Sequence, residues 1–372
     1  MNMLEGRIGR QESVCILIQA MGSICTFSLH TLAMYENGNT AYIWMPMGIA
    51  LAALAGLAVR RCMSRMGEYD LSTLYHNALG RVLGGAALIA VAIALLWQCS
   101  SLLNHFLSDL HGYIFPTCRY GAVIFWVVIA VAYIAWGGLE RIARTGKCIA
   151  PLVGLVLLIA LLLPFKGYRV YRLYPFPGDT LWVIAGLCLR SFAQMLPVIL
   201  LTLSFTDALQ GEASVARTIL IGSAAAFVLV LLVQLAMGLV FTAEQLEELN
   251  MPLFRLNMNL LSDGYYLRQD KSSVFIWLMA AILGAAYLLY GFAYLICKAT
   301  GAQNIRPALL TGTVSLICIL LLRREALFSL FEGVQAWISH FGGYLVLPPL
   351  LLACVVCFIK KKRNGGVRRH DA

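Results

Sequence analysis

The chain has 372 residues, of which 60% are hydrophobic and 12% are charged, and its formal net charge is +10. Soluble domains carry about a quarter charged residues, so this composition excludes a water-soluble fold and predicts an all-α integral membrane protein. The positive charge lies in short loops and in the C-terminal tail. That placement is typical of a protein anchored against anionic lipid and argues against a nucleic-acid partner.

Apolar segments, taken in chain order, predict about ten transmembrane helices. The predicted spans cover residues 13–35, 41–60, 82–104, 120–137, 148–165, 181–206, 216–241, 273–298, 307–322 and 337–359. We expect one transmembrane domain over residues 1–372, with helices 1–5 in about 13–165 and helices 6–10 in about 181–359. A basic cytoplasmic tail, 360–372, follows the last span.

Basic residues set the expected orientation. With ten spans, the side that holds both termini carries about twice as many Lys and Arg residues as the other side. The positive-inside rule therefore predicts that both termini are cytoplasmic.

Two loops are longer than a simple connection requires. In the inner loop, 61–81, Leu71, Leu74, Tyr75 and Leu79 recur at helical spacing, which predicts a short amphipathic helix at the membrane interface. The outer loop, 242–272, carries leucines on one face, and we expect a helix that covers the outer end of the bundle.

Polar residues inside the spans suggest a ligand site. The first and sixth spans both hold small or polar residues at mid-length, which predicts interrupted helices at equivalent positions of a five-plus-five inverted repeat. An interrupted helix exposes backbone groups that need a cavity or a ligand. The competing interpretation is ordinary helix packing by small residues. The predicted ligand-binding residues are Gly22, Ser23, Thr26, Trp97, Arg190, Ser191, Phe192, Gln194 and Tyr287.

Arg190 is the one charged residue predicted to lie deep in the membrane, about ten residues into its span. One hypothesis is that it binds a ligand carboxylate or the free carbonyl groups of a broken sixth helix. The other is that it extends toward the interface or pairs with a loop carboxylate. No span core holds an acidic residue, so proton coupling is not indicated, while sodium coupling through backbone carbonyls stays open.

Motifs for catalysis are missing from the sequence. It contains no P-loop, HExxH, GxSxG or GxGxxG, and no paired Cys/His spacing for zinc. Most of the eleven cysteines lie in apolar segments, where they act as small hydrophobic residues. We therefore expect no enzyme, no cofactor and no metal site.

Several short segments resemble one family, the B subunits of bacterial spore germinant receptors (the GerAB/GerKB type) of the amino acid–polyamine–organocation (APC) superfamily. The resemblance is carried, in chain order, by Gly6–Gln11, Asp70–Gly84, Gly137–Arg144, Met251–Trp277 and Asn304–Pro307. Members often have Pro-Phe-Gly-Glu in the sixth helix, whereas here Ser191-Phe192 is followed by Ala193-Gln194.

The resemblance implies a ten-helix, transporter-like fold with broken helices 1 and 6. It also implies a receptor subunit in the inner membrane of the spore that binds a small germinant, often an amino acid. Its partners would be an A subunit in the membrane and a lipoprotein C subunit. The alternative function is an amino acid permease, a secondary transporter with the same fold, because fold alone does not fix function.

Overall fold

The computed structural model describes residues 8–29, 40–67, 70–162, 165, 167–174, 180–209, 212–242, 245, 269–322 and 346–356. The predicted covering helix in 242–272 and the basic tail lie almost wholly outside these residues. So do the end of the first predicted span and the beginning of the last.

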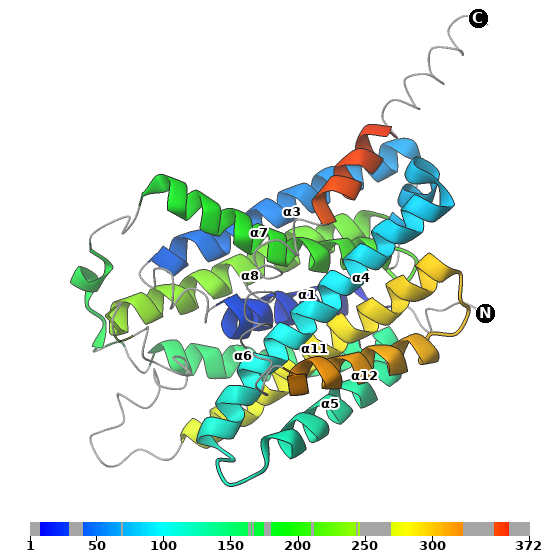
Figure 1. The fold of residues 1–372 in the computed structure, drawn as a ribbon. Coiled ribbons are helices and arrows are strands. Elements are labelled where there is room, and N and C mark those ends of the chain that lie inside the picture. The colour runs from blue at the N-terminus through cyan, green and yellow to red at the C-terminus, as the bar shows by residue number, and fades with distance from the viewer. Residues whose placement is uncertain are drawn as a thin grey trace, which may run out of the picture.

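The described residues form a bundle of helices (Figure 1). In chain order these are α1 (Arg10–Ser23), the π-helix η1 (Ile24–Leu29), α3 (Ala41–Met66), α4 (Leu71–Tyr113), α5 (Tyr120–Trp136), α6 (Gly138–Leu162), the short 3-10 helix η4 (Val170–Leu173), α7 (Leu181–Ser204), α8 (Glu212–Val240), α11 (Gln269–Thr300) and α12 (Arg306–Leu322). A last apolar helix covers Leu347–Val356.

Ten apolar segments of the described chain match the ten predicted spans. Seven are helices long and apolar enough to cross a membrane, and three are shorter apolar helices: α5, α12 and Leu347–Val356. The main difference lies in α6, which begins at Gly138, about ten residues before its predicted start. The apolar pattern in the sequence begins later than the helix, because the first turns of α6 carry the charged residues Glu140, Arg141 and Arg144.

Helix packing follows the expected five-plus-five repeat. In such a repeat, helix n of the first half is equivalent to helix n+5 of the second. The first helix, α1, packs against the seventh, α8, just as the sixth, α7, packs against the second, α3. The pairs α3–α8, α4–α11 and α5–α12 each join a helix to its own equivalent, and all three pairs are in contact. The helix pairing is therefore the one that a five-plus-five inverted repeat predicts.

The chain just before α1 and the chain just after α7 meet directly. The backbone N–H of Ile8 donates to the carbonyl of Ala208 at 3.0 Å, and Ile8 forms a parallel bridge with Leu209. This contact fixes the beginning of the first helix beside the end of the sixth, as antiparallel equivalent helices require.

The predicted amphipathic helix of the inner loop is present as the first two turns of α4. Leu71, Leu74 and Tyr75 are fully buried on one face. Gly80 then takes φ 83° and ψ 175°, a conformation essentially open to glycine alone, and bends the chain into the long membrane-spanning part of α4.

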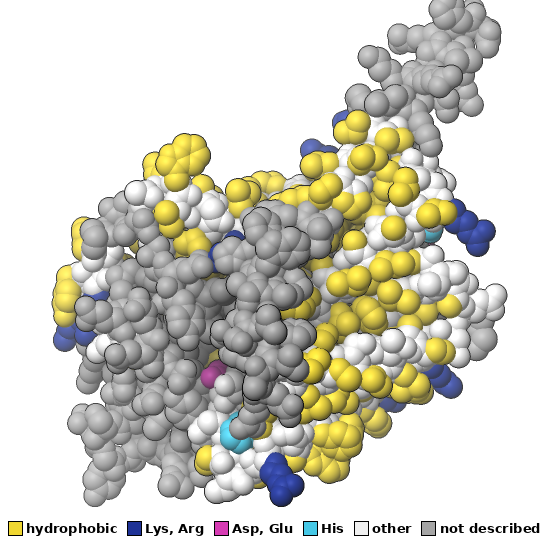
Figure 2. All heavy atoms as spheres, viewed as in Figure 1, with side chains coloured by type: hydrophobic (Ala, Val, Ile, Leu, Met, Phe, Trp, Pro, Cys, Tyr) yellow, Lys and Arg dark blue, Asp and Glu magenta, His cyan; other side chains and the backbone are white. Residues whose placement is uncertain are grey.

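The outer surface of the bundle suits lipid. Figure 2 shows hydrophobic side chains covering the face over α4, α11 and α12, with Lys and Arg side chains toward the ends of the helices. Large apolar side chains such as Trp126 and Tyr133 on α5 are 68% and 70% exposed. This much exposed apolar surface is stable in a bilayer and would be a liability in water.

Candidate ligand-binding site

The first helix changes its geometry in the middle of the bundle. It is α-helical to Ser23 and continues as a π-helix from Ile24 to Leu29. π-Helical turns inside α-helices are rare and frequently mark functional sites. The predicted break with exposed backbone groups is therefore not seen between Arg10 and Leu29, where the helix changes type directly after Gly22-Ser23 but continues.

A cavity of about 100 Å³ lies against this change of geometry. It is bounded by the first helix together with α6, α8 and α11. Gly22, Ser23 and Thr26, three of the predicted ligand-binding residues, line it. Its other lining residues are Ile18, Gln19, Phe27, Ala150, Val153, Gly154, Leu157, Leu229, Trp277 and Ala280.

Two buried polar side chains border the cavity. The Nε2 of Gln19 donates to the carbonyl of Gly146 on α6 at 3.2 Å, whereas its Oε1 is buried and has no hydrogen-bond partner among the described residues. The Oγ of Ser23 donates to the carbonyl of Ala280 on α11 at 3.3 Å. A buried acceptor without a donor is costly, so the Gln19 carboxamide favours a ligand that brings an N–H or O–H group.

Aromatic rings close the π-helical end of the cavity. The ring of Phe27 lies edge-on to Phe106 of α4 at 5.2 Å and edge-on to Trp277 of α11 at 6.1 Å between ring centres. These contacts fix the π-helical turn against two neighbouring helices.

The sixth helix differs from the prediction. α7 runs as one α-helix from Leu181 to Ser204, through Arg190–Gln194 and past Pro197, so the expected break in this helix is wrong. Ser191 instead makes a contact between helices, as the competing interpretation expects. The Oγ of Ser191 donates to the carbonyl of Met45 on α3 at 3.1 Å.

The remaining predicted residues also lie in packed contacts and are not among those that line the cavity. The side chain of Gln98 on α4 donates through Nε2 to the backbone carbonyl of Gln194 and to its Oε1, the latter at 3.3 Å. The hydroxyl of Tyr287 on α11 lies 3.3 Å from the Oγ1 of Thr202. Arg190 is buried, and Phe192 and Trp97 are half-buried.

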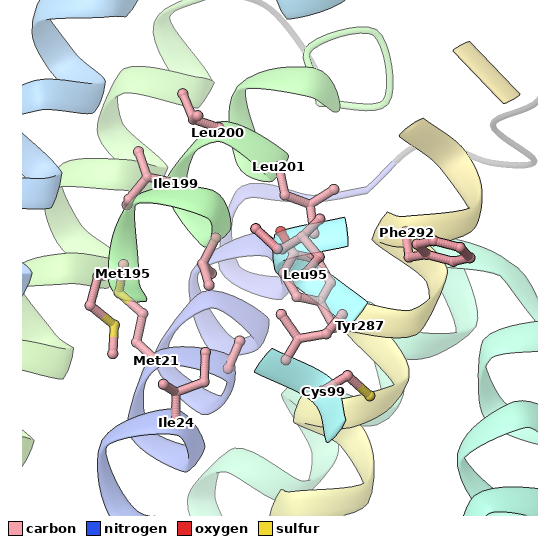
Figure 3. Packing of buried hydrophobic residues seen from close by; sticks show 14 of the residues in the cluster. Met21, Ile24, Leu95, Cys99, Met195, Ile199, Leu200, Leu201, Tyr287 and Phe292 are labelled. Atoms are coloured by element: carbon pink, nitrogen blue, oxygen red, sulfur yellow. The ribbon is translucent and has the colours of Figure 1, made fainter. Parts of the chain in front are cut away.

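The centre of the bundle between the first and sixth helices is filled by apolar side chains. Figure 3 shows Met21 and Ile24 of the first helix, and Met195 of α7, in one packed cluster with Leu95 and Tyr287. All five are at most 2% exposed. The structure thus places open space on the opposite side of the first helix, toward α6, α8 and α11.

Sequence reasoning missed the contribution of α6, α8 and Trp277 to the cavity. Ala150, Val153 and Leu157 are ordinary apolar residues at membrane depth, and nothing in their pattern distinguishes a cavity wall from a lipid-facing surface. Gln19 was visible as a polar residue of the first span, and its position one turn before Ser23 was the signal that could have included it.

A model of the family described as "Spore germination protein" matches residues 9–355. The chain belongs to this spore germination protein family. The match covers nearly the whole transmembrane bundle, including the cavity and the cluster between α1 and α7. Curated protein sequences gave no match.

Solved structures with the same fold are transporters. A Na⁺-coupled sialic acid symporter in a substrate-bound, outward-open state is 10% identical, with a TM-score of 0.62, over 93% of this chain and 79% of that one. Mhp1, a nucleobase–cation symporter family transporter in a closed conformation, is 10% identical, with a TM-score of 0.63, over 96% and 94%. A manganese transporter from Eremococcus coleocola is 14% identical, with a TM-score of 0.57, over 93% and 76%. At these identities the likeness shows the fold alone.

Family and fold are those of membrane receptors and transporters. The described residues contain no group of three or more His, Cys, Asp or Glu side chains that could hold a metal ion.

Proposed function

We propose that this spore germination protein is the germinant-binding subunit of a receptor in the inner membrane of the spore. A small germinant, an amino acid in the simplest case, binds in the cavity beside the π-helical turn and alters the balance between two states of the bundle. The observation that carries the proposal is the buried Oε1 of Gln19, which has no hydrogen-bond partner among the described residues. Gln19 lines a small cavity at the only change of helix type in the described membrane-spanning helices.

The size and lining of the cavity define the ligand class. A volume of about 100 Å³ is smaller than the roughly 150 Å³ of an engineered cavity that holds benzene. The walls are mostly apolar, with Gln19, Ser23 and Thr26 as the polar groups. An amino acid with a small apolar side chain fits this chemistry, since its ammonium group donates to Gln19 and its side chain meets the apolar wall.

The signal would pass through the first helix. A ligand shifts an equilibrium only by the difference in its affinity for the two states. The π-helical turn, held by Phe27 to α4 and α11, is the element whose geometry the bound ligand would bias. Partner subunits, a membrane A subunit and a lipoprotein C subunit, would read this change, with both termini of this chain in the cytoplasm.

Two serines provide a matched test. Ser23 and Ser191 each sit in mid-helix and donate to a carbonyl of a neighbouring helix, at 3.3 and 3.1 Å, but only Ser23 lines the cavity. In spores that depend on this receptor, we expect Ser23→Ala to raise the half-maximal germinant concentration about fivefold, the worth of one hydrogen bond. Ser191→Ala should change it less than twofold. Equal effects at equal protein levels would place the germinant elsewhere.

The second candidate function is an amino acid permease, which the transporter structures of the same fold favour. The two functions differ in whether the chain moves its ligand across the membrane. The purified protein in liposomes should bind labelled amino acid without accumulating it, and spores lacking the gene should lose their response to that amino acid. Concentrative uptake by the protein alone would establish the permease instead.

A further inference from the structure

The cavity beside Ser23 continues into a second space. An apolar groove between α6 and α8, with a volume of about 700 Å³, shares three lining residues with the cavity: Gly154 and Leu157 of α6 and Leu229 of α8. Leu229 also lies against the first helix, since a Cβ built on Gly22 would be 3.9 Å from its Cδ2 atom. The cavity and the groove therefore adjoin along these three shared residues.

The groove opens toward the lipid side of the bundle. α6 packs mainly on α1 and α11 and only slightly on α8, which leaves the space between α6 and α8 unfilled by helix contacts. Leu158 of α6 and Val228 of α8, two of its lining residues, are 53% and 52% exposed. An apolar group that passes from the cavity into the groove would therefore meet apolar side chains and then lipid.

The polar and apolar ends of the cavity follow one another along two helices. The first helix and α6, the fifth, run in the same direction across the bundle, because successive helices alternate in direction. They are joined at one level by the hydrogen bond from Gln19 to the carbonyl of Gly146. From that level, Ser23 lies about 6 Å along the first helix, and Gly154 lies about 12 Å along α6. A ligand whose ammonium group lies near Gln19 and Ser23 would therefore direct an apolar side chain toward Gly154.

Gly154 keeps the passage between the two spaces open. A Cβ built on this residue would meet no atom within 4 Å, so no neighbouring side chain fills the space beside it. Because Gly154 lines both the cavity and the groove, a larger side chain at this position would occupy the place where they adjoin.

We propose that the side chain of the ligand passes beside Gly154 into the α6–α8 groove, so that the site accepts amino acids with long apolar side chains as well as small ones. This inference rests on the proposed function and adds the place of the side chain. A closed pocket rejects side chains above a fixed size, whereas a groove that opens to lipid sets no upper limit on their length. Each methylene group that leaves water for the groove should strengthen binding about fourfold.

The test uses a series of amino acids with straight side chains: alanine, norvaline, norleucine and 2-aminooctanoic acid. Binding to the purified full-length protein in lipid nanodiscs should strengthen along the series, by up to about fourfold for each methylene group. Empty nanodiscs correct for partition of the longer members into lipid. Gly154→Leu, which fills the passage, should bind alanine within about twofold of the unaltered protein and 2-aminooctanoic acid at least about tenfold more weakly.

Two further variants make the test specific. Gly186 of α7 is an exposed glycine where a built Cβ also meets no atom within 4 Å, and it lines neither the cavity nor the groove. Gly186→Leu should therefore leave binding of the whole series unchanged. Leu157→Ala widens the passage and should strengthen binding of 2-aminooctanoic acid relative to alanine, an effect that a misfolded protein cannot produce.

Three results would overturn the proposal. Binding that weakens sharply beyond norvaline in the unaltered protein would mean a closed pocket with a size limit. Equal weakening of alanine and 2-aminooctanoic acid by Gly154→Leu would mean a general distortion of the cavity. Equal effects of Gly154→Leu and Gly186→Leu would mean that the position of the added side chain is unimportant. In each case alanine still binds the unaltered protein, so the proposed function stands, whereas a protein that binds no member of the series would contradict the proposed function itself.

Discussion

The first and sixth helices, which occupy equivalent positions in the predicted repeat, differ in what surrounds their polar side chains. On the first helix, Gln19 and Ser23 lie beside a cavity, and Gln19 keeps one buried acceptor that no described residue satisfies. On the sixth, Ser191 and Gln194 lie in close contacts with α3 and α4. The same residue types thus line a cavity in one place and pack between helices in the other.

The largest expected difference concerns added volume. A Cβ at Gly48 of α3 would lie 2.2 Å from the Oγ of Ser191 and 2.7 Å from the backbone nitrogen of Phe192, whereas a Cβ at Gly154 of α6 meets no atom within 4 Å. We expect Gly48→Leu to cost about 3 kcal/mol or more of folding free energy, because α3 and α7 must separate. Gly154→Leu should change it by less than about 1 kcal/mol.

Reversible unfolding in mixed detergent micelles measures both variants. A tolerated Gly48→Leu would mean that the sixth helix can move away from α3 with little cost. In that case the packed face would be as open to a ligand as the cavity face.

Arg190 provides the next test of the same difference. It is buried in α7 and does not line the cavity next to Ser23. If its role is structural, Arg190→Gln lowers stability by about 1–3 kcal/mol and leaves the half-maximal germinant concentration unchanged. Arg190→Lys keeps the positive charge but replaces the guanidinium group. The stability of this variant shows whether the charge or the shape of the side chain stabilises the protein. A tenfold shift in the half-maximal germinant concentration at normal protein level would show that Arg190 takes part in ligand binding.

Composition and periodicity were enough to predict ten helices and their order, because burial in lipid imposes long apolar segments. The inverted repeat was predicted from the polar residues of the first and sixth spans and from the family resemblance. Half of the site could also be predicted: Gly22-Ser23 marks a real change of helix type. The sequence could not show that α7 is unbroken. Polar residues such as Ser191 and Gln194 give the same sequence pattern when they face a ligand and when they bond to neighbouring helices, as they do here with Met45 and Gln98. The cavity walls from α6 and α8 could not be predicted because they consist of ordinary apolar residues.

A smaller effect is expected where the π-helical turn meets its aromatic neighbours. Phe27→Leu keeps an apolar side chain but removes the edge-on contacts with Phe106 and Trp277. We expect a loss of about 1–3 kcal/mol of folding free energy, since two aromatic pairs are lost and each contributes about 0.5–1.5 kcal/mol, together with a wider cavity. Germination assays with larger amino acids should then show a broader range of germinants. Phe205, a buried ring at the end of α7, packs against the rings of Tyr287 and Tyr294 and does not line the cavity. The matched change Phe205→Leu should lower stability without changing the range of germinants.

The smallest expected effect concerns a hydrogen bond between the π-helical turn and α4. The hydroxyl oxygens of Ser28 and Ser101 lie 2.9 Å apart, and Ser101 is partly exposed, so it can find another partner when Ser28 is lost. Ser28→Ala should therefore cost only about 0.5–1 kcal/mol of stability. If the turn is the moving element, the same change should alter germinant sensitivity by more than its effect on stability predicts. A stability change with unaltered sensitivity would show that the turn stays fixed to α4 in both states.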